Sequence, residues 1–349
     1  MIPEEEINEL VSRPYPWETL RGKRILIAGA TGLVGSYLGV VLAKICLRYN
    51  FEVKVMSRSI DNLNETYGSY TSSNFSVFPH DVNESIGDEE YDIVVHCASN
   101  THPILYSTDP IGTITANTIG LNNLLHNVKS GGRFIFLSSV EIYGENRGDV
   151  EKFDESYCGY IDCNTLRAGY NESKRLGEAL CQAYIKQRNV NCIVARLSRT
   201  YGPSMKLNDS KAISQFKLSG ALKKDIILKS KGNQLYSYCH SFDAADAIFF
   251  LLFYGEIGQA YNIAGLDSDC SLLDLATMIS ELSGSELKYD VPDLVEQQGY
   301  SKSTVATLDI SKICSLGWKP SISLRVGLDS TVKNLRTDLS SAKKIHEVK

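Results

Sequence analysis

The sequence has none of the paired cysteine or histidine motifs that hold a structural metal. Its nine cysteines occur singly between Cys46 and Cys314, without a Cys-x-x-Cys pair, and none of its six histidines forms a His-x-x-x-His pair. An odd number of scattered cysteines fits neither a disulfide framework nor a zinc site. The sequence therefore predicts reduced, mostly buried thiols and no metal centre.

The sequence also lacks the features that direct a chain to a membrane or to nucleic acid. Its longest apolar runs, such as residues 247–254, are far shorter than the roughly 20 residues needed to cross a bilayer. Its start is acidic, whereas an export signal is basic and then apolar. The net charge is −5, and there is no long run of Lys and Arg. We therefore expect a cytoplasmic protein without membrane or nucleic-acid partners.

The order of apolar and helical segments predicts the fold class. Between residues 23 and 140, short apolar runs alternate with helical stretches, which is typical of a parallel sheet with helices on both faces. The runs around Ile27 and Val95 are continuously apolar, as strands buried on both faces should be. We expect strands at 24–28, 52–56, 93–98, 133–138 and 191–197 and helices at 35–49, 115–128 and 170–188.

After Gly202 this alternation becomes irregular. A polar stretch is followed by helices near 213–222 and 272–282 and by short strands such as 260–263. The change of pattern predicts a smaller lobe packed on the first. The first 20 and the last 15 residues are expected to be peripheral additions.

A glycine-rich turn follows the first strand and opens the next helix, with the spacing Gly-x-x-Gly-x-x-Gly. Glycines permit a tight turn and a close approach of backbone to a pyrophosphate, and the start of the helix offers free N–H groups and the positive end of its dipole. The alternative is a glycine turn that only packs the helix onto the strand. We predict a dinucleotide phosphate site formed by Gly29, Thr31, Gly32, Leu33, Val34 and Gly35.

The ends of the second and third strands bear on the identity of the dinucleotide. Ser57 and Arg58 stand where an NAD-binding fold usually presents a carboxylate to the ribose 2′-hydroxyl. A hydroxyl and a guanidinium suit a 2′-phosphate, so NADP is slightly favoured over NAD; a solvated arginine is the alternative. Asp81, followed by Val82, is suited to accept a hydrogen bond from the adenine amino group, although an ordinary loop aspartate would look the same.

The ends of the fourth and fifth strands carry residues suited to the cofactor and the substrate. Small residues, Ala98 and Ser99, stand where a cofactor must lie flat against the sheet. The fifth strand ends at Ser139, with Glu141 shortly after it. In open α/β sheets this carboxyl edge is where ligands bind, so we predict that Ser99 and Ser139 contact the substrate.

Tyr170 and Lys174 lie four residues apart, which on a helix places the phenol and the ammonium on the same face. A lone Tyr-x-x-x-Lys is expected about once by chance, so its weight comes from following the glycine turn and Ser139 in order. A phenol is a poor base at neutral pH until a cation stabilises the phenolate. Lys174 would supply that charge, Ser139 would bond the substrate oxygen, and Tyr170 would move the proton. Together they predict the interconversion of an alcohol and a carbonyl.

These motifs closely resemble those of the extended short-chain dehydrogenase/reductase family, also called the epimerase/dehydratase family of nucleotide-sugar enzymes. The resemblance covers residues 23 to about 329. Its later landmarks are Asp109-Pro110, Asn117-Thr-Ile-Gly120, Tyr201-Gly202-Pro203, Tyr261-Asn262-Ile263-Ala264 and Leu316-Gly317-Trp318-Lys319-Pro320. The resemblance implies a Rossmann-type doubly wound parallel sheet with a smaller C-terminal α/β substrate lobe.

The resemblance also implies a division of the chain. The NAD(P)-binding domain would cover 21–200 and the substrate lobe 201–335, with an N-terminal extension at 1–20 and a tail at 336–349. Asn117, together with Tyr170 and Lys174, would belong to the cofactor site. Members commonly form homodimers through two helices, which correspond here to 112–129 and 170–188.

Departures from the family pattern bear on the net reaction. The 4,6-dehydratases carry an Asp-Glu pair after the hydroxyl residue, whereas this chain has Val140-Glu141, which matches the UDP-glucuronate decarboxylases. Those decarboxylases and the UDP-galactose 4-epimerases use an arginine where Tyr236 stands here, while Arg199 occupies a place where many relatives have Asn. The anion-binding charge would then have moved to Arg199, with Lys206, Lys211 and Lys217 as additions. A surface or structural role for Arg199 is the alternative.

The sequence thus predicts NAD(P)-dependent oxidoreduction of a sugar carbon, C4, in a nucleotide-linked or phosphorylated sugar. Ser139, Tyr170, Lys174 and Glu141 would be catalytic, and Ser99, Val140, Arg199, Lys206 and Tyr236 would join Ser139 in binding the substrate. Epimerisation or reduction is the expected outcome, with a decarboxylase-like or dehydratase-like reaction as the alternative. A non-catalytic dinucleotide-binding sensor or scaffold is the alternative of another class.

Overall fold

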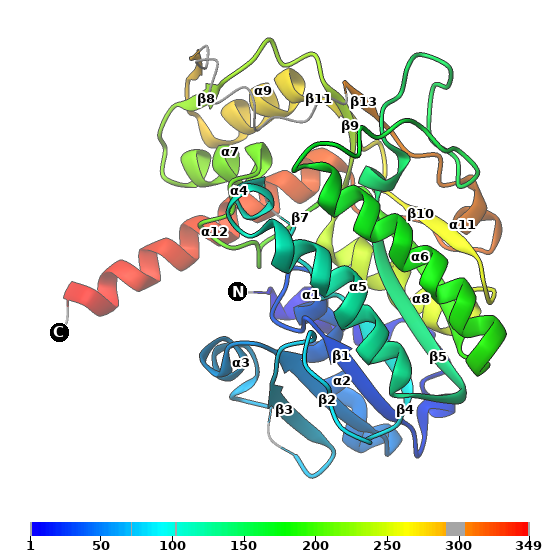
Figure 1. Ribbon diagram of the computed structural model, residues 1–349. Helices are drawn as coiled ribbons and strands as arrows, with labels where there is room; N and C mark the ends of the chain where they lie inside the picture. Colours follow the sequence, from blue (N-terminus) through cyan, green and yellow to red (C-terminus); the bar gives the residue numbers. More distant parts are fainter. Residues whose placement is uncertain (1, 71, 102, 291–303, 348–349) are drawn as a thin grey trace.

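The computed structural model describes residues 2–70, 72–101, 103–290 and 304–347. A seven-stranded parallel sheet runs through the larger part of the molecule in the order β10-β6-β5-β4-β1-β2-β3 (Figure 1). The strands are β1 (Arg24–Ala28), β2 (Glu52–Ser57), β3 (Phe75–Pro79), β4 (Tyr91–His96), β5 (Val128–Ser139), β6 (Asn191–Leu197) and β10 (Ala260–Ile263). The parallel sheet expected from the sequence is confirmed.

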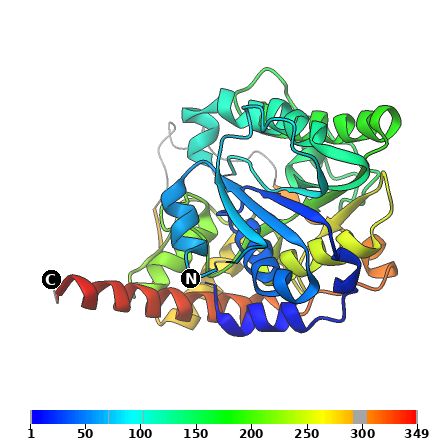
Figure 2. The ribbon, with the colours of Figure 1, turned by 90° about the horizontal axis from the view of Figure 1, so that it is seen from below.

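Helices cover both faces of this sheet, which lies between the two helical layers in Figure 2. Alternate residues of β1 point to opposite sides: Ile25 and Ile27 belong to the apolar cluster of one layer, Leu26 and Ala28 to that of the other. One layer contains α1 (Glu4–Ser12), α2 (Gly35–Tyr49) and α8 (Ser241–Tyr254). The other contains α5 (Pro110–His126) and α6 (Ala168–Arg188).

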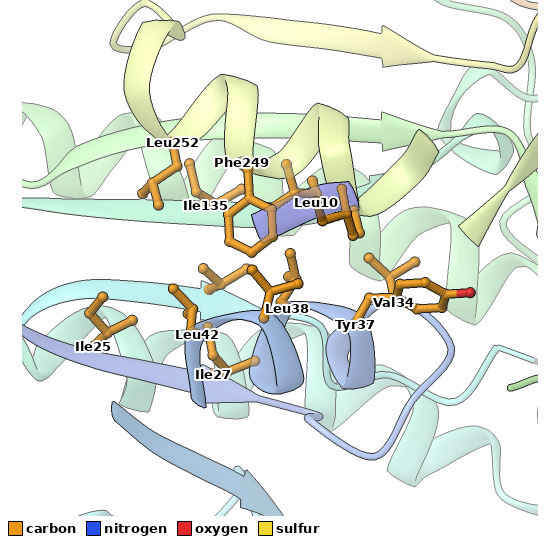
Figure 3. Close-up of a cluster of buried hydrophobic side chains, with 14 of the residues drawn as sticks. Leu10, Ile25, Ile27, Val34, Tyr37, Leu38, Leu42, Ile135, Phe249 and Leu252 are labelled. Carbon is orange, nitrogen blue, oxygen red and sulfur yellow. The ribbon is translucent and has the colours of Figure 1, made fainter. Parts of the chain in front are cut away.

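Four apolar side chains between residues 2 and 20 are part of this core, which corrects the expectation that the segment is peripheral. Ile7 and Leu10 of α1 are buried, as are Trp17 and Leu20 of the short helix η1 (Trp17–Leu20). The Trp17 ring meets that of Phe249 edge to face, with centroids 5.2 Å apart. Figure 3 shows Leu10 beside side chains of α2 and α8. The helix α1 thus combines an acidic first turn with a narrow apolar face, Ile7 and Leu10, that packs on the core.

The smaller lobe is built on a four-stranded mixed sheet. In it β9 (Leu235–His240) pairs parallel with β7 (Arg199–Tyr201) and β13 (Val305–Ala306) and antiparallel with β11 (Asp269–Ser271). Because β7 follows β6 after one residue, the two sheets are joined where the parallel strands end. The lobe also contains α7 (Ala212–Ala221), β8 (Ile226–Leu228), α9 (Leu272–Ser283), β12 (Leu287–Tyr289) and α12 (Leu324–Glu347).

The C-terminal helix α12 is continuous through the expected boundary of the tail at residue 336. Its first half packs on α7 and α9, with Leu328 and Val332 buried, and the Arg336 guanidinium donates to the carbonyl of Gly220. The last turns extend away from the body (Figures 1 and 2). The remaining short helices are α3 (Ile60–Tyr67), α4 (Pro103–Thr108), η2 (Val140–Tyr143) and α11 (Ser311–Ser315).

Candidate active site

The glycine turn lies at the carboxyl end of β1, pressed against the segment that follows β4. Gly29 has φ +78°, and a Cβ atom there would lie 2.4 Å from the backbone nitrogen of Ala98. A Cβ on Gly35 would lie 2.3 Å from the carbonyl oxygen of Gly29. Val34 at the start of α2 provides no side-chain cap. The Ser36 N–H donates to the Gly32 carbonyl, and the positive end of the helix dipole remains directed at an anion. This cradle fits a dinucleotide phosphate.

The remaining cofactor positions surround this turn. The Thr31 and Ser57 hydroxyls are hydrogen-bonded at 2.8 Å, which ties the turn to the end of β2, and Arg58 beyond it is exposed. Asp81 accepts from the backbone N–H of Asn83, so its carboxylate also stabilises its own turn. Val82, the next residue, is buried. Ser99 follows Ala98 and is half-buried.

Asn117 lies between helices rather than on an open edge. It is fully buried in α5, and its amide donates to the Thr113 carbonyl and to the Ser173 hydroxyl of α6, each at 3.1 Å. Its Oδ1 atom has no hydrogen-bond partner among the described residues. Asn117 therefore fixes α5 against the helix that carries Tyr170 and Lys174.

The structure brings Ser139, Tyr170 and Lys174 together. Ser139 ends β5, and its hydroxyl lies close enough to the phenol of Tyr170, on the first turn of α6, to lower the pKa of that phenol. The Lys174 ammonium donates to the Leu137 carbonyl at 2.7 Å and lies 6.0 Å from the centroid of the Tyr170 ring. Ser139 ends a strand, whereas Tyr170 and Lys174 share a helix, yet all three meet at the carboxyl edge of the sheet.

Burial shapes the protonation of this group. Burial raises the pKa of Tyr170 to about 12, although the neighbouring Ser139 hydroxyl lowers it. Burial lowers the pKa of Lys174 to about 7. The phenol is therefore protonated at neutral pH in the free protein, and it becomes a base only when additional positive charge arrives beside it.

Glu141, two residues after Ser139, lies between two guanidinium groups. Its carboxylate is 3.2 Å from Arg167 and 3.5 Å from Arg199. Burial opposes ionisation of Glu141, but the two cations and the hydrogen bond from Arg167 hold its pKa below the ordinary value. Glu141 is therefore ionised at neutral pH and has no proton to donate.

Arg199 is not a surface cation. Its guanidinium carbon lies 3.7 Å from the centroid of the Tyr236 ring, and Tyr236 is buried. The two positions at which the family pattern is broken are thus in direct contact. Val140, the third predicted substrate position in this region, is buried and belongs to the same apolar cluster as Tyr236.

The three lysines proposed as additional charges do not join Arg199. Lys206 is exposed, and Lys211 pairs with Asp209 at 3.0 Å. Lys217 is almost fully buried and donates to the carbonyls of Gly202 and Met205. Burial lowers the pKa of Lys217 to about 8. Through these contacts Lys211 and Lys217 hold the loop that precedes α7, so their roles are structural.

Two residues of this site were missed from the sequence. The ring of Tyr106 in α4 is stacked on that of Tyr170, and the Arg167 guanidinium lies 5.8 Å from the Tyr106 ring centroid. Arg167 had a readable signal, because it stands three residues before Tyr170 at the start of the same helix. Tyr106 had none, because α4 is a short helix whose position depends on tertiary contacts.

The described residues contain no group of three or more His, Cys, Asp or Glu side chains arranged to hold a metal ion. None of the helices in the described part of the chain is long and apolar enough to span a membrane.

The comparisons with known proteins agree with this geometry. The model of the "NAD dependent epimerase/dehydratase family" matches residues 25–264. UDP-glucuronic acid decarboxylase 6 of Arabidopsis thaliana is 31% identical over 327 residues, which cover 92% of this chain and 91% of the relative. UDP-glucuronic acid decarboxylase 1 of Xenopus tropicalis is 31% identical over 321 residues, covering 91% and 73%.

Solved structures share the fold at lower identity. UDP-glucose 4-epimerase of Thermotoga maritima superposes with a TM-score of 0.75 at 21% identity, covering 90% of this chain and 99% of that one. UDP-glucuronic acid 4-epimerase of Bacillus cereus, in complex with UDP-glucuronic acid and NAD, gives 0.74 at 22% identity with coverage of 90% and 99%.

Proposed function

Because this chain belongs to the NAD dependent epimerase/dehydratase family, we propose that it oxidises and re-reduces C4 of a nucleotide-linked sugar that carries a carboxylate at C6. The convergence of Ser139, Tyr170 and Lys174 beside the Glu141 ion pairs is the observation that carries this proposal. The hydroxyl, phenol and ammonium supply proton transfer at a sugar hydroxyl. One carboxylate between two guanidinium groups leaves a local charge of +1, which suits an acidic sugar.

The chain's own residues account for the proton movements. Ser139 and Tyr170 would both bond the C4 oxygen, and Tyr170 would take its proton while Lys174 stabilises the phenolate. A bound NAD would supply the hydride acceptor and donor for C4 and, in its oxidised form, positive charge near the phenol. Gly29, Gly32 and Gly35 would hold its pyrophosphate.

Loss of the C6 carboxylate is the net reaction that we favour. After oxidation, Ser139 and Tyr170 would hold the negative charge that develops on the C4 oxygen when the C5–C6 bond breaks and CO₂ leaves. A proton then adds at C5, and Tyr170 returns its proton as C4 is reduced. The relatives named above favour this outcome, and the placement of Arg199 over Tyr236 restores a cation where the sequence lacked one.

Epimerisation at C4 of the same acidic sugar is the second candidate. It needs the same Ser139 and Tyr170 chemistry but no loss of carbon, and the fold is shared with an epimerase that acts on UDP-glucuronic acid. Elimination of water is disfavoured because Glu141 is ionised and Val140 carries no acid. Net reduction of the sugar would require a cofactor that is exchanged after each turnover.

The decisive experiment is to incubate the purified protein with UDP-glucuronate and NAD and to identify the products by NMR and mass spectrometry. A UDP-pentose with release of CO₂ supports decarboxylation, whereas a C4-inverted uronate supports epimerisation. Absence of conversion would overturn the proposal. Tyr170→Phe serves as the control, and turnover equal to wild type would favour a non-catalytic dinucleotide-binding protein.

The preference between NAD and NADP is a separate proposal. The exposed Arg58 and the adjacent Ser57 offer a guanidinium and a hydroxyl to a ribose 2′-phosphate. Arg58→Ala should therefore weaken NADP binding and leave NAD binding unchanged in isothermal titration calorimetry. Equal effects on the two dinucleotides would show that Arg58 does not recognise the 2′-phosphate.

A further inference from the structure

The Arg199 guanidinium contacts Tyr236 and Glu141, but one of its hydrogen-bond donors has no partner among the described residues. Its guanidinium lies over the Tyr236 ring at 3.7 Å, and one amino group lies 3.5 Å from Glu141. Its Nε atom is buried and has no hydrogen-bond partner among the described residues. A buried guanidinium donor without a partner is costly unless a ligand completes it.

We infer that Arg199, seated on Tyr236, is the residue that recognises the carboxylate of the substrate and thereby selects acidic over neutral sugars. This inference rests on the proposed function, because it assumes a nucleotide-linked sugar in the site. It assigns the selection to a contact between β7 and β9, not to the residues that move the proton.

The strand register explains why Arg199 and Tyr236 meet. Arg199 is paired with Tyr238 in the parallel ladder between β7 and β9. Tyr236 precedes Tyr238 by two residues, so both tyrosines point to the same face of the sheet. Stacking on an aromatic face fixes the plane of a guanidinium while leaving its N–H edge available for a planar anion.

The two arginines beside Glu141 have different roles in this arrangement. Arg167 donates a hydrogen bond to Glu141 at 3.2 Å, whereas the contact of Arg199 is longer, at 3.5 Å. Arg167 therefore suffices to hold the ionised Glu141 when a substrate carboxylate approaches Arg199. The incoming anion would share or displace the weaker contact and neutralise the remaining positive charge.

The same donor chemistry suits the diphosphate of a nucleotide sugar, so the position of Arg199 matters. Glu141, its partner, has its backbone N–H bonded to the Ser139 hydroxyl. Arg199 thus lies at the reacting end of the site, beside the group that would hold C4. The C6 carboxylate is bonded to C5, the ring carbon next to C4, whereas the diphosphate is attached on the opposite side of the sugar ring.

The test measures binding, not turnover, by titration calorimetry with UDP-glucuronate, UDP-glucose and UDP. The wild-type protein should bind UDP-glucuronate more tightly than UDP-glucose. Arg199→Met should weaken UDP-glucuronate binding roughly 10- to 100-fold, as expected for a charge-assisted pair, and leave the other two ligands unchanged. Arg199→Lys should retain part of the preference, and melting temperatures confirm that each variant is folded.

Two further variants test the mechanism of recognition. Glu141→Gln removes the carboxylate that competes for Arg199 and should tighten UDP-glucuronate binding. A misfolded variant would bind more weakly, so a gain in affinity cannot result from misfolding. Moving the cation across the contact, with Tyr236→Arg in the Arg199→Asn background, should restore part of the preference for the acid. Neither variant should change the affinity for UDP-glucose by more than a few-fold.

The outcomes separate the inference from the proposed function. Equal losses for all three ligands in Arg199→Met would assign Arg199 to the diphosphate, and unchanged affinities would make it structural; either result overturns the inference. A wild-type preference for UDP-glucuronate that depends on Arg199, in a protein without turnover, would sustain the inference and refute the proposed reaction. If the wild-type protein binds no nucleotide sugar, both fail.

Discussion

The phenol rings of Tyr106 and Tyr170 are stacked, with centroids 4.9 Å apart and planes inclined by 27°. Tyr170 is carried by the long helix α6, but Tyr106 comes from α4, the short segment that follows β4. Offset stacking of two aromatic rings contributes about 0.5–1.5 kcal/mol beyond the area that it buries. Tyr106 is therefore a positioning residue that restricts the orientation of the phenol on which proton transfer depends.

Replacing this ring should impair turnover more than binding. We expect Tyr106→Leu to lower kcat by about tenfold, the equivalent of ~1.4 kcal/mol, because the Tyr170 ring gains freedom. Tyr106→Phe retains the stacked ring and should remain close to wild type. Steady-state kinetics on both variants make the comparison; a Phe variant as slow as the Leu variant would show that the Tyr106 hydroxyl, not the stacking, matters.

The parts of this site that could be predicted from the sequence are those set by short-range spacing. Tyr170 and Lys174 are separated by one helical turn, and the three glycines occupy one tight turn, so short-range spacing sufficed to place them. The partners of Glu141 were hidden, because the 3₁₀ helix η2 that carries it meets the start of α6 and strand β7 only in the folded chain. Contacts between elements that are distant in the sequence produce no periodic pattern from which they could be predicted.

Gly35 should be intolerant of any side chain. The Cβ of an alanine would lie 2.3 Å from the backbone oxygen of Gly29, so the turn itself would have to shift. We expect Gly35→Ala to weaken NAD binding at least tenfold in titration calorimetry and to lower the melting temperature. Gly220→Ala is the control: its Cβ would meet side-chain atoms of α9 at 3.1 Å, far from the cofactor turn in the chain. Unchanged NAD affinity in Gly35→Ala would contradict the phosphate cradle.

The outer surface of α5 and α6 should mediate self-association. The two helices pack side by side, and between them they expose Ile111, Ile119 and Leu176, each more than half accessible. We expect a homodimer by light scattering and a monomer for Leu176→Glu, because a charge would be buried in the interface. Val326→Glu, at an equally exposed apolar position on α12, is the matched control. A monomeric wild-type protein at micromolar concentration would disprove this.

The N-terminal helix is tied to the core through one of its glutamates. Glu6 accepts a hydrogen bond from the Tyr37 hydroxyl at 2.6 Å. Tyr37 is fully buried in the first turns of α2, directly after the glycine turn. The extension therefore supports the helix whose start forms the phosphate cradle.

Glu6 should make the stability of the protein depend on pH. Burial raises its pKa to about 7, and repulsion from Glu9, Glu5 and Asp243 adds to this, while the Tyr37 hydrogen bond opposes it. The folded protein thus retains a proton that the unfolded chain, with a pKa near 4.5, loses earlier. The contribution of Glu6 is therefore greatest below pH 4.5 and is lost progressively as the pH rises to about 7.

Replacing Glu6 by the neutral isostere should remove this dependence. We expect Glu6→Gln to be more stable than wild type at pH 8 by about 1–2 kcal/mol, a value reduced from the full shift because the carboxyl is only partly buried. The difference should shrink towards pH 5, where Glu6 is protonated in the folded state. Urea denaturation of both proteins between pH 5 and 8 measures it, with Glu18→Gln, at an exposed glutamate of η1, as the control. A difference that stays constant across this range would show that Glu6 does not titrate on folding.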